Sequence, residues 1–133
     1  AGVLNVKLKY IDQWQNKRIL NAEYYNQHLK DVETPYSNDI LHHVYNQYTI
    51  KTGHRDSLRN YLSENGVQTS IFYPYPIHTQ KCISKLGYLA GDFPICERIC
   101  KEVLSIPIYP DLTIDEQDYI INQINNFSGE NIV

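Results

Sequence analysis

The stretch HVYNQYTIKTGHRDSLRNYLSENG, residues 43–66, changes its hydrophobic period at Gly53. Before Gly53 apolar and polar side chains alternate, so we expect Tyr48 and Ile50 on one side of a half-buried strand. After it, apolar residues recur at helical spacing over 55–65, and the glycine that follows is typical of a helix end. A strand followed by a helix in so short a stretch predicts an α+β fold.

The rest of the chain continues this mixture of short strands and helices. Prolines and glycines separate the segments, because proline cannot donate to a sheet and glycine adopts left-handed turns. We expect strands over 67–72 and 104–106, a helical stretch that ends at Gly87, a helix that begins at Pro94, and a last helix capped by Thr113-x-x-Glu116. The predicted fold class is α+β: a small, mainly antiparallel sheet of about three strands with helices packed over it, in a single domain spanning residues 1–133.

The N-terminal segment predicts one long amphipathic helix within residues 1–31. From Leu4 to Leu29, apolar side chains recur every three or four residues. Such a helix would be about 40 Å long, at about 1.5 Å per residue. It is longer than a domain of this size needs for its own core, and no capping residue precedes it. We therefore expect the chain to be part of a longer protein, in which this helix connects it to a preceding domain.

The composition excludes several classes of function. The chain has 133 residues, a mass of 15.6 kDa, a net charge of -3 and a pI near 5.9, whereas nonspecific nucleic-acid binders carry a basic excess. No apolar run approaches the roughly 20 residues of a membrane span, and the first residues do not resemble a secretory signal. We therefore expect a cytoplasmic protein with reduced cysteines that binds neither nucleic acid nor membrane.

Three groups of residues leave a chemical alternative open. Cys96 and Cys100 share a helix face and could present thiolates to a metal, but no matching ligands are near, so we expect core packing. Cys82 and His78 could form a nucleophile pair, although nothing nearby orients the histidine. Arg55 is expected to reach outward to a carboxylate or phosphate, while the aspartate after it caps the helix.

The run Tyr73-Pro-Tyr-Pro-Ile-His78 is expected to form a stiff loop with an exposed backbone. Its two prolines lack amide donors and hold the backbone extended. Tyrosine and histidine side chains on such a loop lose little entropy when they bind a ligand, and they offer donors at fixed positions. We therefore predict a binding surface here, with a plain connecting loop as the alternative.

A series of short motifs also runs along the chain in a recognisable order. They are Arg18 with Ala22-x-Tyr24-Tyr25, Tyr45-x-x-Tyr48-x-Ile50, Arg55-Asp56-x-Leu58, Leu62-x-x-x-Gly66-Val67-x-Thr69, Tyr73-Pro-x-Pro-x-His78-x-Gln80, Gly87-Tyr88, Asp92-Phe-Pro-x-x-Glu97 and Leu104-Ser-Ile-Pro-x-Tyr-Pro110. Together they resemble the DegT/DnrJ/EryC1/StrS family of aminotransferases, over nearly the whole chain. The run of residues 73–78, which we call the proline loop, and the last motif are the most diagnostic.

The resemblance implies a pyridoxal-phosphate (PLP) enzyme of fold type I that aminates a keto sugar carried on a nucleotide diphosphate, with glutamate as amino donor. It covers only the C-terminal small domain of such enzymes. In this family the Schiff-base lysine, the aspartate that pairs with the pyridine nitrogen and the phosphate-binding residues lie in a large N-terminal domain, and no lysine of this chain sits in that motif. We therefore expect this chain alone to bind no PLP and to be inactive, and the full-length enzyme to be a homodimer.

Carried onto matching positions, the resemblance makes Phe72, Tyr73 and His78 the substrate-binding residues. Many members of the family have histidine where this chain has Phe72, so stacking or apolar contact is expected to replace a polar contact there. The chain would contribute a wall of the substrate cleft and dimer contacts. The alternative is a self-contained binding or dimerisation module with the same small-domain fold and no catalysis.

Overall fold

The computed structural model describes residues 2–38 and 42–128. The fold class predicted from the sequence, α+β, is confirmed. Helices α, 3₁₀ helices η and strands β follow one another as α1 (Gly2–Leu8), α2 (Ile11–His28), β1 (Tyr48–Lys51), α3 (Arg55–Glu64), η1 (Ile77–Thr79), η2 (Lys81–Leu86), α4 (Pro94–Glu102), β2 (Val103–Ile106) and α5 (Ile114–Asn125).

The sheet has two antiparallel strands, β1 and β2, in which Tyr48 pairs with Ile106. Single bridges extend it on both outer edges, one made by Glu33 beside β1 and one made by Ser70 beside β2. The strands are joined through α3 and the whole segment up to α4, so the sheet brings together residues that are far apart in sequence.

The third strand predicted over 67–72 is reduced to the bridge at Ser70. The amide of Val67 donates to the carbonyl of Leu62 at 2.8 Å, so it closes the end of α3 and not a ladder. Pro107 follows β2 directly and has no amide hydrogen to extend the pairing. The competing hydrogen bond on one side and the proline on the other explain why this prediction was wrong.

β1 begins at Tyr48 and not at His43 as predicted. Tyr45 adopts a left-handed backbone with φ of 45°, and its amide donates to Nδ1 of His43 at 3.0 Å. The carbonyl of Val44 accepts from Nε of Arg18 at 3.2 Å. Hydrogen bonds to side chains therefore replace strand pairing in this segment.

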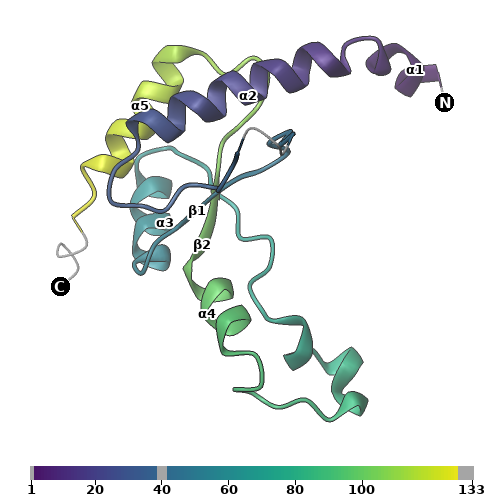
Figure 1. The fold of residues 1–133 in the computed structure, drawn as a ribbon. Helices are drawn as coiled ribbons and strands as arrows, with labels where there is room; N and C mark the ends of the chain where they lie inside the picture. Colours follow the sequence, from purple (N-terminus) through teal and green to yellow (C-terminus); the bar gives the residue numbers. More distant parts are fainter. Residues whose placement is uncertain (1, 39–41, 129–133) are drawn as a thin grey trace.

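The core lies where α2, α3 and α5 meet the sheet (Figure 1). Its fully buried side chains include Ile50, Leu62 and Leu104. Tyr25 of α2 is also fully buried, and its hydroxyl donates to the carbonyl of Pro107 at 3.0 Å. Burial raises the pKa of Tyr25 well above its usual value. The core thus joins three helices and both strands into one packed unit.

The last helix, α5, begins with the predicted capping box. The hydroxyl of Thr113 accepts from the amide of Glu116 at 3.3 Å, and Oε2 of Glu116 accepts from the amide of Thr113 at 2.8 Å. The carboxylate of Glu116 accepts from both the amide and the hydroxyl of Thr113, and these two bonds hold the pKa of Glu116 below its ordinary value. Ile120 and Ile124 are buried in the core, as their spacing predicted.

The helix predicted as one piece within 1–31 is broken in two after Leu8. The amide of Tyr10 donates to the carbonyl of Lys7 at 3.0 Å, three residues back, which tightens the turn. No described residue of α1 is buried, so no packing holds the chain straight at this point. Figure 1 shows α1 and the first turns of α2 projecting beyond the packed elements.

Residues 73–102, here called the arm, extend from the sheet away from the other helices (Figure 1). The arm contains the proline loop, η1, η2 and α4. As predicted, Gly87 ends η2 with φ of 79°, and Pro94 occupies the first turn of α4. Within the arm, which is described throughout, only His78 and Cys100 are buried. Apolar burial therefore contributes far less to the stability of the arm than to that of the core.

Candidate functional site

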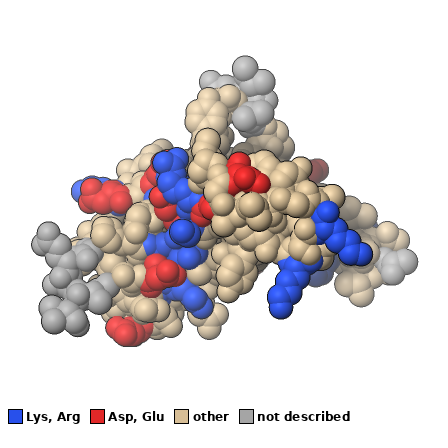
Figure 2. Space-filling model, turned by 90° about the horizontal axis from the view of Figure 1, so that it is seen from below, with Lys and Arg blue, Asp and Glu red and all other residues tan. Residues whose placement is uncertain are grey.

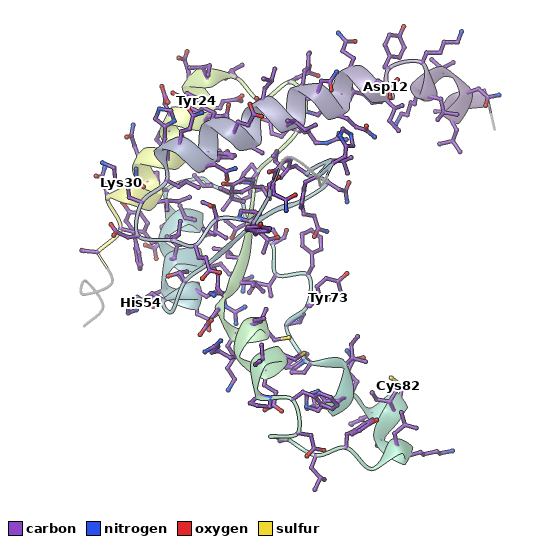
Figure 3. The ribbon with its side chains drawn as sticks, in the orientation of Figure 1. Asp12, Tyr24, Lys30, His54, Tyr73 and Cys82 are labelled. Atoms are coloured by element: carbon purple, nitrogen blue, oxygen red, sulfur yellow. The ribbon has the colours of Figure 1, made fainter. Side chains whose placement is uncertain are left out.

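A hollow of about 460 Å³ lies at the start of the arm, between residues 72–75 and residues 79–81. We call it the loop cavity. Figure 3 places Tyr73 where the arm leaves the core and Cys82 near the far end of the arm. The loop cavity therefore lies between the core and the tip of the arm, within the segment that the sequence predicted to be a binding surface.

Phe72 and Tyr73 present their side chains to solvent at this cavity. Their exposed fractions are 51% and 69%. Pro76 holds an extended backbone, with φ of -59° and ψ of 141°. Since proline limits the conformations of the loop, two exposed aromatic rings stand on a backbone with little freedom. Such rings can stack on a planar or apolar ligand at low entropic cost.

His78 is placed differently from the other two predicted site residues. Its exposed fraction is 8%, and its Nε2 lies 2.9 Å from Oε1 of Glu97 on α4. Its ring also packs against Phe93, with ring centroids 4.8 Å apart. The structure thus brings Phe72 and Tyr73 together at the cavity, while the ring of His78 contacts α4.

Glu97 joins three parts of the arm through one carboxylate. Its Oε1 accepts a hydrogen bond from the amide of Gly91 at 2.7 Å in addition to its contact with His78. The Gly91 amide, followed by His78, holds the pKa of Glu97 below its ordinary value. The carboxylate is therefore ionised at neutral pH and ties the proline loop and the Gly91 turn to α4.

Sequence reasoning missed Lys81, which also lines the loop cavity. It is the only charged residue among the described residues of that lining. Tyr75 adds a third aromatic ring on the same wall. A lysine just after a stiff aromatic loop is a signal that could have been read, because an aromatic surface beside a cation fits a ring that carries a phosphate.

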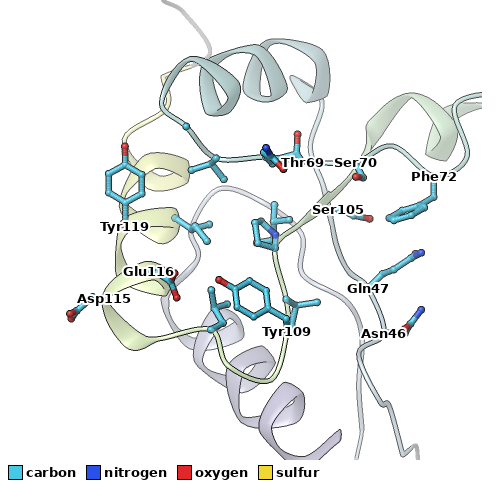
Figure 4. A pocket seen from close by; sticks show the side chains of 18 residues that line it. Asn46, Gln47, Thr69, Ser70, Phe72, Ser105, Tyr109, Asp115, Glu116 and Tyr119 are labelled. Atoms are coloured by element: carbon cyan, nitrogen blue, oxygen red, sulfur yellow. The ribbon is translucent and has the colours of Figure 1, made fainter. Parts of the chain in front are cut away.

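A larger hollow of about 760 Å³ opens beside the sheet, between residues 46–47, 66–70 and 105–109 and the first half of α5 (Figure 4). We call it the sheet cavity. Glu116 and Tyr109 are on its wall, and burial together with Glu116 raises the pKa of Tyr109. Phe72 lies at its edge and so contributes to both hollows.

The two cavities differ in charge. The described lining of the sheet cavity contains the carboxylates of Asp115 and Glu116 and no lysine or arginine, whereas that of the loop cavity contains Lys81 and no carboxylate. A diphosphate is repelled by the first arrangement and attracted by the second. Figure 2 shows acidic and basic side chains intermingled over the left part of one face of the molecule, whereas basic side chains predominate toward the right in that view.

Neither cavity by itself fits PLP. The cofactor needs a lysine for its aldehyde and a carboxylate for its ring nitrogen. Among the described lining residues, one cavity supplies only the lysine and the other only carboxylates. Neither lining alone therefore supplies both groups that the cofactor needs.

The structure shows where the residues behind the three chemical alternatives lie. Cys100 is buried as predicted, but Cys96 is exposed, so core packing was wrong for Cys96. Among the described residues, no group of three or more histidine, cysteine, aspartate or glutamate side chains could hold a metal ion. Nε2 of His78 faces Glu97, and Sγ of Cys82 lies 3.9 Å from Oε1 of Gln80, so the two are not paired.

Arg55 does not reach outward as predicted. It is buried, and its guanidinium donates to the carbonyls of Cys100 at 3.3 Å and Val103 at 3.4 Å. Asp56 pairs with its Nε at 2.7 Å and makes no side-chain cap on α3. Arg55 therefore fastens the base of the arm to α3.

Comparison with known proteins identifies the relationship. The model of the DegT/DnrJ/EryC1/StrS aminotransferase family matches residues 1–125. The chain belongs to this family. A pleiotropic regulatory protein from Geobacillus stearothermophilus is 37% identical over 132 residues, which are 96% of this chain and 36% of that protein. A dTDP-3-amino-3,6-dideoxy-alpha-D-galactopyranose transaminase from Aneurinibacillus thermoaerophilus is 33% identical over 129 residues, covering 96% of this chain and 35% of the enzyme.

A solved structure of a family relative agrees with the fold. DesV from S. venezuelae, in complex with a ketimine intermediate, superposes with a TM-score of 0.89 at 27% identity, over 98% of this chain and 36% of DesV. The chain thus spans about a third of the length of these relatives. In the described part of the chain, no helix is both long and apolar enough to cross a membrane.

Proposed function

We propose that this chain is the C-terminal small domain of a PLP-dependent aminotransferase that aminates a nucleotide-linked keto sugar, with glutamate as amino donor. The family match over residues 1–125 supports the reaction class. The chain's coverage of about a third of its relatives supports the role as one domain of a longer enzyme. The loop cavity carries the substrate assignment, because aromatic rings and a lysine fit a base or sugar joined to a diphosphate.

Phe72 and Tyr73 are the residues proposed to contact the substrate, and Lys81 joins them; His78, the third residue predicted from the sequence, is not part of the cavity lining and acts through the loop. In this proposal Phe72 stacks on the ligand, and Tyr73 offers both a ring and a hydroxyl donor. Lys81 neutralises the diphosphate. His78 supports the same loop from its buried position against α4. The residues of this chain thus bind and orient the sugar nucleotide, while the bond-making groups lie elsewhere.

PLP, in this proposal, is held by a large domain outside this chain. When bound, it supplies the electron sink for transfer of the amino group. The exposed apolar side chains of α1, which include Val3, Leu4 and Val6, provide a surface for that domain. Further exposed apolar side chains on the arm provide surface for homodimer contacts.

A substitution at each cavity in the full-length protein encoded by the gene tests this assignment. Tyr73→Ala is expected to weaken binding of UDP or dTDP about tenfold in calorimetric titration, because one stacked ring is removed. The absorption of bound PLP should not change. Tyr119→Ala, at the rim of the sheet cavity, serves as the control and should leave the affinity unchanged.

Two results would contradict the proposal. Loss of bound PLP in Tyr73→Ala would mean that the loop belongs to the cofactor site. Equal affinity losses in both variants would mean that the loop cavity is not the nucleotide site. Nucleotide binding by a full-length protein that takes up no PLP would favour the alternative, a binding module without catalysis.

A further inference from the structure

The proline loop is tied to the rest of the molecule at two points. At its start, the bridge between Ser70 and Ser105 fixes the backbone to β2, with N–O distances of 3.0 and 2.9 Å. At its end, His78 is bonded to Glu97 on α4. Among the described residues, 72–77 form no hydrogen bond to the core or to α4. The position of the exposed aromatic rings therefore depends on these two anchors.

The second anchor is itself fixed to the core. Arg55 of α3 holds the carbonyls of Cys100 and Val103, at the C-terminal end of α4 and the start of β2. Glu97 lies one turn before Cys100 on the same helix. A continuous path thus leads from the core through Arg55 and α4 to Glu97 and His78, and from there to the loop.

The contact between Glu97 and His78 has the properties of a strong anchor. Both side chains are shielded: counting side-chain atoms alone, 21% of Glu97 and 7% of His78 is exposed. The carboxylate accepts from both His78 and the amide of Gly91, which fixes its orientation. Phe93 packs on the His78 ring and is itself contacted by Tyr88, with ring centroids 5.3 Å apart. Hydrogen bonds to an ionised carboxylate are stronger than those between neutral groups.

We propose that Glu97 is a positioning residue for nucleotide binding. It holds His78 against α4 and so fixes the proline loop, which preorganises Phe72 and Tyr73 for the ligand. Glu97 itself does not touch the ligand. The inference rests on the proposed function, since it assumes that these rings bind the sugar nucleotide. A loop released from Glu97 has to be ordered again on binding, and this cost lowers affinity.

The test measures loop order and affinity in the same full-length variants. Glu97→Ala is expected to weaken UDP or dTDP binding about fivefold and to speed amide hydrogen exchange at residues 77–80 at least tenfold. Exchange in β1 and β2 should not change. Glu97→Gln keeps an acceptor and should show a smaller effect of both kinds. Glu102→Gln, the same change on the same helix but outside the contact with His78, is the control and should behave like wild type.

A double variant separates positioning from direct contact. If Glu97 acts through His78, His78→Ala with Glu97→Ala should bind no more weakly than either single variant. Faster exchange with unchanged affinity would overturn the inference, because the loop would then not need the anchor. Weaker binding with unchanged exchange would also overturn it, because Glu97 would then act on the ligand directly.

Tyr73→Ala distinguishes failure of this inference from failure of the proposed function. If Tyr73→Ala weakens nucleotide binding and Glu97→Ala does not, only the role of Glu97 is wrong. If wild type binds neither nucleotide, or if Tyr73→Ala binds as wild type does, the proposed function fails and the role of Glu97 fails with it. Glu97→Gln keeps the comparison possible if Glu97→Ala does not fold.

Discussion

The core and the arm of this chain are built in different ways. The core buries apolar side chains from three helices and two strands, whereas the arm buries only His78 and Cys100 among its residues, all of which are described. The arm is instead fixed by a few polar contacts, above all those of Glu97 and Arg55. Apolar packing makes the scaffold, and directed hydrogen bonds hold an exposed loop on it. This division leaves the aromatic rings of the loop exposed on a packed scaffold.

The largest expected effect comes from deleting apolar volume in the core, and the same kind of deletion in the arm should have almost none. Leu104→Ala in β2, at a side chain with no exposed surface, should lower the free energy of unfolding by about 2–5 kcal/mol. Ile95→Ala on α4, where 66% of the side chain is exposed, should cost less than about 0.5 kcal/mol. Urea denaturation of the two variants measures both values. Similar costs would contradict the distinction between core and arm.

A smaller effect on the free energy of unfolding is expected from the N-terminal cap of α5. This cap stabilises one end of the helix and buries no apolar side chain. Thr113→Ala removes the hydroxyl that accepts from Glu116 and should lower the free energy of unfolding by about 1 kcal/mol. Thr113→Ser keeps the hydroxyl and is the matched control, with a loss below about 0.5 kcal/mol. Equal losses in the two variants would show that the hydroxyl does not contribute.

The smallest expected effect lies in the arm and appears only in binding. Lys81→Gln in the full-length protein should weaken UDP or dTDP binding about threefold and reduce its dependence on salt, because one exposed cation near the diphosphate is lost. Lys85→Gln, on the same 3₁₀ helix but outside the loop cavity, is the control. Calorimetric titrations at two salt concentrations measure both effects. If the two variants weaken binding equally, Lys81 has no specific role.

Much of the core could be predicted from sequence because local rules decide it. The ends of α3 and α5 follow from Gly66 and from the capping box of Thr113 and Glu116, and each signal lies within a few residues of the feature it controls. The wrong predictions concern places where groups distant in sequence determine the backbone conformation. Arg18 draws the carbonyl of Val44 away from strand pairing, and no local pattern announces a bond across 26 residues.

In the candidate site too, features set by neighbouring residues could be predicted and those set by distant residues could not. The exposure of Tyr73 follows from the prolines beside it, so the sequence predicted an exposed loop correctly. The burial of His78 could not be predicted, because its partner Glu97 lies 19 residues away on another helix. The outward course expected for Arg55 was wrong for a similar reason, since the carbonyls that bind it are 45 and 48 residues away.

The most direct test of the central claim is a crystal structure of the full-length protein with UDP or dTDP bound. The account predicts that the nucleotide lies against Phe72 and Tyr73, with Nζ of Lys81 within about 4 Å of the diphosphate. A nucleotide bound in the sheet cavity, or at any place without contact to residues 72–81, would contradict the claim.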